Sequence, residues 1–506
     1  MNKYSTHLNP TSHPRDTSEL RRTKPVRTMS GVAPMAVMMK PFMCPGQCIY
    51  CPLEIGMPKS YLSDEPAAQR AKQLDFDPYR QVEMRLKQFE LTGHNTDKVE
   101  VIVIGGTFSA YEKEYKKWFI TEIYRALNDY SSSLRGVSDE AIQYPDGLPR
   151  EYARNDRDID EITRNEKAKN RVVALSVETR PDWVTEEEVK LIRSLGVTKV
   201  QLGVQAIDDE IAKITKRGHG IKEVREATRS LRNAGIKICY HIMPNLPGSN
   251  PEKDIEMNRL IYSDPGLKPD YVKIYPCMVI PQTALHKMWL KGEFKPYDDE
   301  TLKRVLKEIS ADTPEYVRID RLVRDISRKW VADGSIKSNM RQEVEAELIK
   351  EGRPCRCVRC REIRNGEYRT QELKNSRIIY ETQGGEENFL SIEGEGKLMA
   401  LLRLRLPERS EKMLFKELEG AAIVREIHSF GEVVGIRLEN SKKEKFEAPK
   451  KVQHRGLGKK LMQEAEKIAR ERGYGRLAVI SAIGTREYYR KLGFVLEGSY
   501  MIKELC

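Results

Sequence analysis

Apolar runs and amphipathic runs alternate along the chain between residues 99 and 326. The amphipathic runs, such as TEEEVKLIRSLG (185–196) and IKEVREATRSLRNAG (221–235), have the periodicity of helices. The runs that resemble buried strands cover residues 99–108, 172–182, 198–206, 237–248, 271–280 and 316–326. Nearly continuous apolar strands that alternate with helices are typical of a parallel sheet covered by helices. The pattern therefore predicts an α/β fold with six βα units, a partial (βα)6 barrel.

The pattern changes near residue 386. Three stretches, LMALLRLRLP, AAIVREIHSFG and EVVGIRLE, indicate antiparallel strands over residues 398–407, 421–431 and 432–439. They are followed by an amphipathic helix (453–473), a strand (477–482) and the run EYYRKLGFVLEG (487–498). Residues 131–170 are highly polar and interrupt the βα rhythm, so we expect them to form a partly helical excursion. The segments predicted are a basic N-terminal arm (1–30), the barrel (31–326), a linker (327–385) and a C-terminal α+β domain (386–506).

The bulk composition limits the class of protein. The chain has 506 residues, of which 39% are hydrophobic and 32% charged, and its mean hydropathy is -0.60. No apolar run approaches the ~20 residues of a membrane helix, and the N-terminus lacks the apolar stretch of a signal peptide. These features predict a cytoplasmic protein of two or three domains that does not bind a membrane. Nine cysteines in such a chain indicate metal sites rather than disulfides.

The net charge is positive and unevenly distributed. It amounts to +12, from 88 Lys and Arg against 76 Asp and Glu, and the isoelectric point is about 9.0. The N-terminal arm is rich in basic residues and includes Arg21, Arg22, Lys24 and Arg27. An excess of positive charge indicates a polyanionic partner such as a nucleic acid. A solvated tail is the alternative for the arm on composition alone.

Three closely spaced cysteines carry the strongest chemical signal. They are Cys44, Cys48 and Cys51, in the sequence KPFMCPGQCIYCP. The CxxxCxxC spacing suits a [4Fe–4S] cluster whose fourth iron has no protein ligand. Such an iron can bind S-adenosylmethionine (SAM), from which an electron then generates a 5′-deoxyadenosyl radical. The alternatives are a zinc turn, which usually takes four ligands, and a disulfide knot, which does not suit a chain without a secretion signal.

Glycines and polar residues stand at the ends of the predicted strands. Gly105, Gly106 and Thr107 follow one strand, and Glu178 ends the next. In a barrel of parallel strands the ligand sites lie at this C-terminal end. We therefore expect the glycine turn to hold the SAM amino group and Glu178 to accept a hydrogen bond from SAM. A tight turn and a surface carboxylate are the structural alternatives. Further polar residues at strand ends are Gln205, His241, Lys273 and Tyr275.

A second cysteine cluster lies in the predicted linker. Its members are Cys355, Cys357 and Cys360, in the sequence GRPCRCVRCRE. The spacing suits zinc with one further ligand, for which Cys239, Cys277 and nearby histidines are candidates. Because no His and Glu set of an open catalytic site accompanies the cysteines, we predict a structural zinc ion that ties the linker to the barrel. Free thiols in a basic loop are the alternative.

A glycine-rich turn opens the predicted helix 453–473. It consists of Gln453, His454, Arg455, Gly456, Leu457, Gly458 and Lys459. Glycines at a helix N-terminus expose backbone N–H groups to a pyrophosphate, and the helix dipole favours the negative charge. The QxxGxG pattern, with the later YYRKLGF, resembles the acetyl-CoA loop of GCN5-related acetyltransferases. Of Tyr488 and Tyr489, we expect one in the core and the other at the thioester. His428 ends the central strand, where it either meets the thioester or is an ordinary strand histidine.

The motifs together resemble a single family. They are CPGQCIYCP, VIVIGGTFSA, VETRPDW, LGVQA, KRGH, MPNLPG, KIYP, QHRGLG and GTREYYRKLGF. They resemble the catalytic subunit of the Elongator complex, a family also called tRNA uridine(34) acetyltransferase or carboxymethyltransferase. The resemblance runs from residue 23 to the terminal strand SYMIKEL. It implies a radical-SAM barrel joined through a cysteine-rich zinc linker to a GCN5-related acetyltransferase domain. The tight cysteine spacing resembles the prokaryotic, especially archaeal, single-subunit members.

The resemblance also implies an activity and its residues. The activity is an acyltransferase that uses SAM-derived radical chemistry and acetyl-CoA to make 5-carboxymethyluridine at the wobble position of tRNA. Cys44, Cys48 and Cys51 would hold the cluster, and Gly105, Gly106, Thr107, Glu178 and Gln205 would line the SAM pocket. Arg171, Ile427, His428, Gln453, Arg455, Gly456, Leu457, Gly458, Lys459 and Tyr489 would bind acetyl-CoA. Lys273 and Tyr275 would face the uridine, with His428 and Tyr489 at the thioester. Arg21, Arg22, Lys24 and Arg27 would bind tRNA, and Cys355, Cys357 and Cys360 zinc.

Two other functions stay open at this point. One is a protein lysine acetyltransferase whose iron–sulfur cluster is only structural, although such a cluster needs no SAM pocket. The other is a tRNA-binding scaffold that has lost its redox chemistry, although the three cysteines and the CoA loop are intact. The expected partners are a tRNA anticodon stem-loop and an electron donor. A homodimer is compatible with the sequence, and a prokaryotic member would not require other Elongator subunits.

Overall fold

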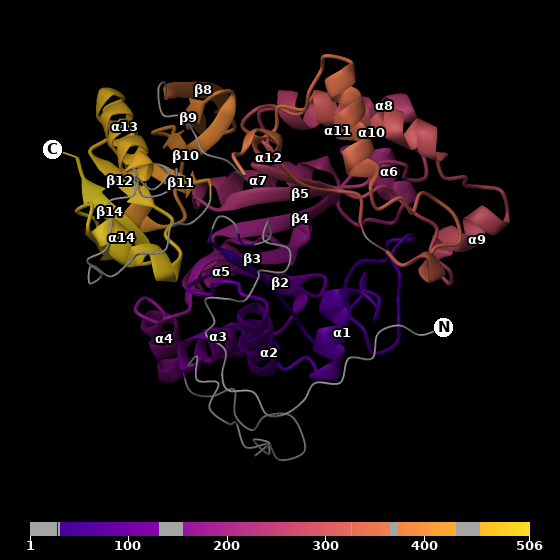
Figure 1. The fold of residues 1–506 in the computed structure, drawn as a ribbon, viewed down its shortest axis with the longest axis horizontal. Helices are drawn as coiled ribbons and strands as arrows, with labels where there is room; N and C mark the ends of the chain where they lie inside the picture. Colours follow the sequence, from indigo (N-terminus) through magenta and orange to yellow (C-terminus); the bar gives the residue numbers. More distant parts are fainter. Residues whose placement is uncertain are drawn as a thin grey trace, which may run out of the picture.

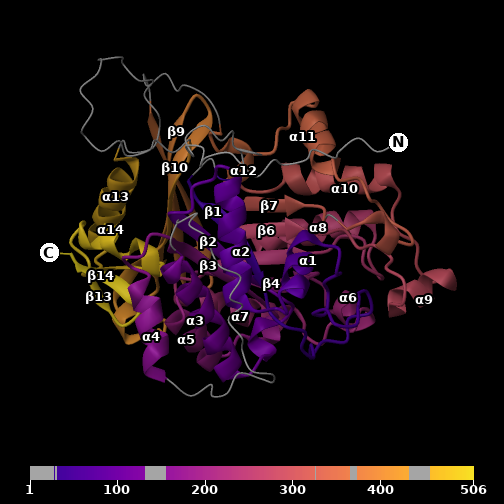
Figure 2. The same ribbon diagram turned by 60° about the horizontal axis from the view of Figure 1, so that its bottom comes forward.

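The computed structural model describes residues 28, 31–130, 155–324, 326–364, 373–431 and 456–505. Two seven-stranded sheets form its centre, and helices cover them (Figures 1 and 2). In the described part of the chain no helix has the length and apolar character needed to cross a membrane.

The first sheet is a partial barrel of parallel strands in chain order. Its strands are β1 (Ala33–Met38), β2 (Lys98–Ile104), β3 (Arg171–Thr179), β4 (Lys199–Gln205), β5 (Lys237–Ile242), β6 (Tyr271–Ile274) and β7 (Arg318–Leu322). The helices around it are α1 (Pro66–Gln73), α2 (Pro78–Leu91), α3 (Lys113–Asp129), α4 (Asn155–Arg164), α5 (Glu186–Ser194), α6 (Asp209–Ile214), α7 (Ile221–Asn233), α8 (Pro251–Ser263), α9 (Ala284–Leu290) and α10 (Asp299–Ala311). The six predicted strands are thus present, and the barrel class is confirmed.

The sheet contains one strand that the sequence pattern did not predict. This strand, β1, precedes the cysteines and pairs with β2 from Ala33↔Val99 to Met38↔Ile104. It is short and contains Pro34, which weakens a strand signal because proline cannot donate to the sheet. β1 lies at the edge of the sheet, where the missing donor is tolerated. Of the polar excursion 131–170, residues 155–164 form α4, and residues 131–154 lie outside the described residues.

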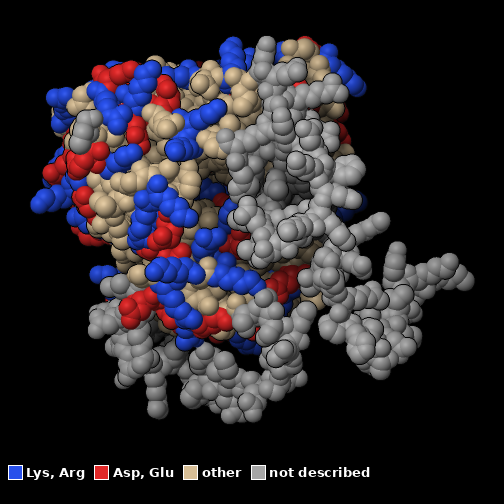
Figure 3. Space-filling view, turned by 60° about the vertical axis from the view of Figure 1, so that its left-hand side comes forward, with Lys and Arg blue, Asp and Glu red and all other residues tan. Residues whose placement is uncertain are grey.

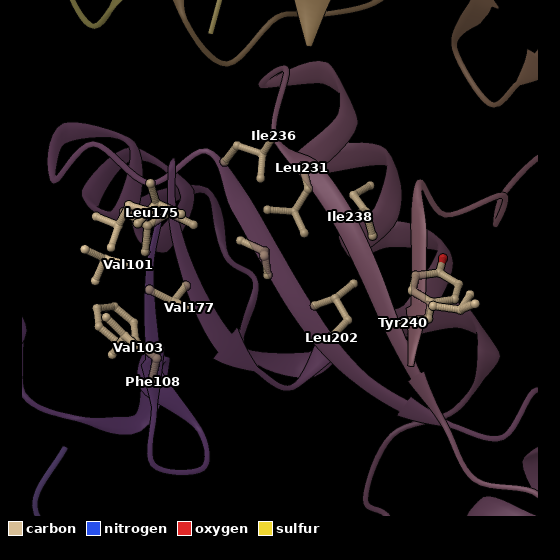
Figure 4. Close-up of a cluster of buried hydrophobic side chains, with 14 of the residues drawn as sticks. Val101, Val103, Phe108, Leu175, Val177, Leu202, Leu231, Ile236, Ile238 and Tyr240 are labelled. Atoms are coloured by element: carbon tan, nitrogen blue, oxygen red, sulfur yellow. The ribbon is translucent and has the colours of Figure 1, made fainter. Parts of the chain in front are cut away.

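Alternation of side chains along the barrel strands separates an apolar outer face from an inner face of mainly polar and small residues. Outward strand residues such as Val101, Leu175 and Leu202 pack under the helices, where they meet helix residues such as Leu231 of α7 (Figure 4). Each of these four side chains is at most 1% exposed. The core that holds the sheet therefore lies outside the barrel, between strands and helices.

The second sheet has the strand order β13-β14-β12-β11-β10-β9-β8. Its strands are β8 (Lys374–Thr382), β9 (Gly385–Gly394), β10 (Lys397–Pro407), β11 (Ala421–Ser429), β12 (Arg476–Val479), β13 (Val495–Glu497) and β14 (Tyr500–Glu504). Helices α13 (Leu457–Glu471) and α14 (Arg486–Arg490) belong to this domain, and α11 (Met340–Lys350) and α12 (Val358–Arg361) precede it. β8 falls within the range 327–385 assigned to the linker by the sequence. The expected strand 432–439 lies outside the described residues.

Buried ion pairs join the two sheets. A bulge in β11 sends the Arg425 guanidinium toward the barrel, where it donates to both carboxylate oxygens of Asp270, one of them at 2.9 Å. Asp270 immediately precedes β6 and also accepts from the backbone N–H of Ile238 at 2.9 Å. Tyr271 donates to Glu426 across the same interface. The second domain is therefore fixed against the N-terminal ends of the barrel strands, at the left of the barrel in Figure 1.

Candidate functional site

The three cysteines of the CxxxCxxC motif lie in the loop after β1. Cys48 is 9% exposed, and Cys44 and Cys51 are partly buried. Cys44 Sγ lies 3.6 Å from Thr107 Oγ1, which places the cysteine loop against the turn after β2. Their sulfurs do not all lie within 4.8 Å of one another, in contrast to the sulfurs of Cys355, Cys357 and Cys360. Thiolates that bind three different irons of a cubane lie further apart than ligands of a single ion, so this loop fits a [4Fe–4S] cluster.

Cations surround the cysteine loop. Arg217 Nη1 donates to Cys48 Sγ at 3.2 Å, and Lys59 Nζ donates to the Gly46 carbonyl. The Arg180 guanidinium lies so close to Gly46 that a Cβ atom there would clash with it. Arg180 Nη1 is buried and has no hydrogen-bond partner among the described residues, although Nε and Nη2 bind Asp182. The free donor fits an anionic group at the loop, such as a thiolate-ligated cluster or a carboxylate.

The residues expected to bind SAM gather at the C-terminal ends of the barrel strands. Gly105 and Gly106 have φ values of +134° and +97°, and a Cβ on Gly105 would lie 3.1 Å from Met39 Cβ. Only glycine suits this turn. An L side chain is strained at these φ values, and the backbone of Met39, just after β1, approaches Gly105 closely. Gln205 ends β4 with a φ of +71°. Glu178 accepts a hydrogen bond from Tyr61 Oη at 2.5 Å, and its burial raises its pKa.

Lys273 lies in a polar cluster inside the barrel. It donates to Gln201 Oε1, which also lies 3.1 Å from His241 Nε2. Burial, reinforced by the Lys273 charge, holds the pKa of His241 well below its ordinary value, so this imidazole is neutral at physiological pH. Tyr275 stacks edge-to-face on His241, with 5.6 Å between ring centroids. The two residues predicted to face the uridine are thus neighbours through His241.

The second domain opens beside Ile427 and His428. β11 pairs with β12 only as far as Val424↔Val479, and β11 then continues to Ser429 without that partner. The two central strands therefore splay apart beyond Val424. His428 packs on Phe430 with 4.4 Å between ring centroids, and burial lowers its pKa.

The described part of the glycine-rich turn begins α13. Gly456 caps the helix with a φ of +74°, and a Cβ on Gly458 would lie 3.0 Å from Tyr488 Oη and 3.5 Å from Ile427 Cδ1. The N-terminus of this helix lies at the splay, and its N–H groups can bind a pyrophosphate. Tyr489 is 5% exposed and packs in the domain core, whereas Tyr488 is 41% exposed. Tyr489 at the thioester stays a prediction, and Tyr488, the other tyrosine of the predicted pair, is the more exposed of the two.

One cavity joins the two halves of the site. It has a volume of about 1780 Å³ and runs from the cysteine loop to α13. The predicted site residues that line it are Cys44, Cys48, Cys51, Gly106, Thr107, Arg171, Glu178, Gln205, Lys273, Tyr275, Ile427, His428, Gly456, Leu457, Gly458, Lys459 and Tyr489. Gly105 is not among the lining residues, although the adjacent Gly106 is. Arg21, Arg22, Lys24, Arg27, Gln453 and Arg455 lie outside the described residues.

The second cysteine cluster fits a single metal ion. The sulfurs of Cys355, Cys357 and Cys360 all lie within 4.8 Å of one another, and in the described ranges they form the only such group of three or more potential ligands. The group includes neither Cys239 nor Cys277. Three converging thiolates suit zinc, which binds thiolates at about 2.3 Å. Val358 N donates to Val317 O at 2.9 Å and Ile363 N to Leu398 O at 3.2 Å, so this loop contacts both sheets.

Removing one of these thiolates is expected to release zinc and destabilise the protein. Cys357→Ser should lower the zinc content and reduce the free energy of unfolding by roughly 3 kcal/mol or more, as expected when a structural metal is lost. Metal analysis and thermal unfolding would measure both. Cys239→Ser, which changes a buried cysteine outside the group, should keep its zinc. An unchanged zinc content in Cys357→Ser would contradict the assignment.

Comparisons with known proteins agree with this geometry. Residues 41–261 match the radical SAM superfamily, residues 269–350 the radical SAM C-terminal domain and residues 357–494 the acetyltransferase (GNAT) family. The fold and the site define an enzyme of the radical SAM superfamily that also carries an acetyltransferase domain.

Similarity over almost the whole chain gives a narrower family. The chain is 42% identical to the tRNA uridine(34) acetyltransferase of Methanocaldococcus infernus, over 96% of this chain and 88% of that protein. Human Elongator complex protein 3 is 36% identical, over 96% and 86%. The solved structure of M. infernus Elp3 with an N-terminal deletion (1-46) matches with a TM-score of 0.76 at 39% identity, covering 94% of this chain and 100% of that one. The chain belongs to the tRNA uridine(34) acetyltransferase family, which includes Elongator complex protein 3.

Sequence reasoning gave no role to several residues at the cysteine loop. Arg217 and Arg180 lie in the quoted motifs KRGH and VETRPDW, yet spacing alone does not show that both guanidinium groups meet near Cys48 and Gly46. Lys59 carried no signal, because its contact with the Gly46 carbonyl depends on how the loop after Cys51 folds back. Gln201 is an inward residue in the middle of β4. An isolated amide within an apolar strand could have indicated a site residue, but this signal is weak.

Proposed function

We propose that this chain makes 5-carboxymethyluridine at the wobble position of tRNA, using acetyl-CoA and SAM. The observation that carries the proposal is the single cavity between the cysteine loop and the N-terminus of α13. A lysine acetyltransferase with a structural cluster would need no such connection. When bound, a [4Fe–4S] cluster with SAM supplies a radical able to remove a hydrogen atom from an unactivated C–H bond, such as that of an acetyl methyl group.

The roles of the chain's own residues follow from their positions. Cys44, Cys48 and Cys51 hold the cluster, and the glycine turn with Glu178 and Gln205 binds SAM. Arg171 and the helix end from Gly456 to Lys459 bind the phosphates of CoA, since cations and free N–H groups favour anions. Lys273 and Tyr275 orient the uridine. The three linker cysteines hold a structural zinc ion.

The substrate also requires a surface for phosphates. The face of the described residues in Figure 3 shows basic and acidic side chains interspersed, without one large patch of either sign. The N-terminal arm, whose sequence includes Arg21, Arg22, Lys24 and Arg27, is our leading candidate for tRNA contact because of its concentrated positive charge. We infer that the protein acts in the cytoplasm on an anticodon stem-loop, with an electron donor for the cluster.

The most economical test of the tRNA proposal is the hydrolysis of acetyl-CoA. It should be slow in the protein alone and should accelerate when unmodified tRNA with a wobble uridine is added. Because counterion release dominates phosphate binding, this acceleration should decline steeply with salt. Hydrolysis or transfer to lysine peptides that ignores tRNA would favour the protein acetyltransferase instead.

Gly458→Val is expected to block the CoA half of the site and to leave the SAM half intact. Its Cβ would meet Tyr488 Oη at 3.0 Å, and its methyl groups would occupy the helix end where the pyrophosphate binds. The dissociation constant for CoA should rise at least tenfold, which corresponds to about 1.4 kcal/mol. Calorimetric titration would measure this change, while SAM cleavage to 5′-deoxyadenosine should persist.

Gly475→Val offers a matched control in the same domain. A Cβ on Gly475 meets no heavy atom within 4 Å, so CoA affinity should stay near that of the unaltered protein. Equal CoA affinity in Gly458→Val and the unaltered protein would remove this helix end from the proposed site.

A further inference from the structure

The cavity runs along the whole interior of the barrel. Four alternate residues of β4 line it: Lys199, Gln201, Gly203 and Gln205. Lys199 and Gln205 are the first and last residues of this strand. On β2 the alternate residues from Lys98 to Ile104 do the same. With about 3.3 Å per residue, these seven-residue strands span about 20 Å. The space is therefore a passage between the two ends of the barrel, rather than a pocket at one end.

Small residues keep this passage open. Pro34 and Ala36 of β1, Ala174 of β3 and Gly203 of β4 are inward positions that line the cavity. In a closed (βα)8 barrel, inward positions are filled by bulky branched side chains that pack into a core. Here most of the bulky apolar residues face outward under the helices, as Figure 4 shows, and the inward face carries mainly small or polar residues, with Ile102 and Ile104 of β2 as aliphatic exceptions.

The acetyltransferase domain covers one end of this passage. Gly484, which precedes α14, approaches the start of β3 so closely that its Cβ would lie 2.5 Å from Arg171 Cβ. Glu426 of β11 reaches Tyr271, the first residue of β6. The cysteine loop lies at the opposite end, against Thr107 after β2. The splay of β11 and β12 thus opens on the N-terminal mouth of the barrel, and the cysteines stand at its C-terminal mouth.

We propose that the acyl end of a CoA thioester travels through the barrel interior, from the acetyltransferase domain to the cysteine end. This inference rests on the proposed function, which requires an acetyl group bound at α13 to react near the cysteines. The cluster of Gln201, His241 and Lys273 stands midway, where a lysine ammonium can donate a hydrogen bond to a thioester carbonyl. The competing route is an arm that swings through solvent outside the barrel.

Photolabelling can locate the acyl end directly. The probe is a CoA thioester of a short acid that carries a diazirine, added to the full chain with its cluster and zinc. After irradiation, peptide mapping by mass spectrometry should find labels on inward residues of β3 to β6, and excess CoA should remove them. Labels confined to the acetyltransferase domain or to the outer surface would overturn the proposal. If no labelling anywhere were displaced by CoA, the proposed function itself would fail.

A plug inside the barrel provides the second test. Ala174→Phe should abolish labels at the cysteine end and lower carboxymethyluridine formation by about a hundredfold, since small misplacements of reacting groups cost this much. CoA affinity and SAM cleavage should persist, because neither site is changed. Ala174→Ser is the matched control with an open passage. If Ala174→Phe does not fold, Ala36→Phe replaces it in this test and blocks the passage from β1. Unchanged labelling and product in a folded plug variant would establish an external route.

Discussion

Replacement of Cys48 by alanine is expected to abolish both SAM cleavage and tRNA modification. Cys48 is one of three thiolates of the CxxxCxxC loop and the one that accepts a hydrogen bond from Arg217. Two thiolates cannot hold a cubane at the geometry that three provide. The iron content and the electron paramagnetic resonance signal of the reduced cluster should disappear, and 5′-deoxyadenosine and modified nucleoside should fall below detection.

Cys277→Ala is the matched control for this prediction. Cys277 is a buried cysteine of the same hydrophobic cluster as Cys48, but it lies outside the motif. Its replacement should leave iron content and product formation within about twofold, allowing for a modest loss of stability from the smaller side chain. A Cys48→Ala protein that still modified tRNA would contradict the assignment of the cysteine loop.

The second large effect concerns the buried ion pairs between the two sheets. Asp270→Asn should reduce the free energy of unfolding by about 3–5 kcal/mol, the usual result of removing one partner from a buried pair. Asp270 and Arg425 have fully buried side chains, and Arg403 lies 3.6 Å from the same carboxylate. Without the carboxylate charge, Arg403 keeps Glu426 and Arg425 keeps Glu387 as acidic partners among the described residues. Thermal and urea unfolding would measure the change.

An exposed ion pair serves as the control, because it shows whether burial causes the large loss of stability expected for Asp270→Asn. Asp312 pairs with Arg259 at 2.8 Å, and the Arg259 side chain is 60% exposed. Asp312→Asn should cost no more than about 1 kcal/mol, because solvent screens exposed pairs. Equal losses in the two variants would show that Asp270 does not join the domains in the way described.

The fold class could be predicted because long apolar strands and amphipathic helices alternate without ambiguity. β1 could not, since six residues that include Pro34 give little periodic signal. β8 was also missed, because its outward residues are exposed and its alternation resembles that of a polar linker. These two strands lie at sheet edges, where only one neighbour and one apolar face constrain the sequence. No predicted strand covers β9 (Gly385–Gly394) either, although it lies between β8 and β10 inside the second sheet.

The candidate site could be predicted as far as local motifs reach. Spacing, or a position after a strand, is enough to identify Cys44, Gly106, Glu178 and Gly458 in the sequence. All four line the common cavity. The contact between Arg217 and Cys48 could not be predicted, because the two residues are 169 positions apart and meet only in the folded barrel. The same holds for the passage through the barrel, which depends on small residues that three separate strands, β1, β3 and β4, contribute.

The most direct test of the central claim follows the acetyl carbon. The cluster-loaded protein is incubated anaerobically with SAM, a reductant, unmodified tRNA and acetyl-CoA labelled with ¹³C at the methyl carbon, and the nucleosides are analysed by mass spectrometry. We predict labelled 5-carboxymethyluridine from the unaltered protein and none from Cys48→Ala, and at limiting acetyl-CoA we predict a correspondingly smaller yield from Gly458→Val. Unmodified tRNA, together with label on protein lysines, would contradict the account and favour an acetyltransferase whose cluster is only structural.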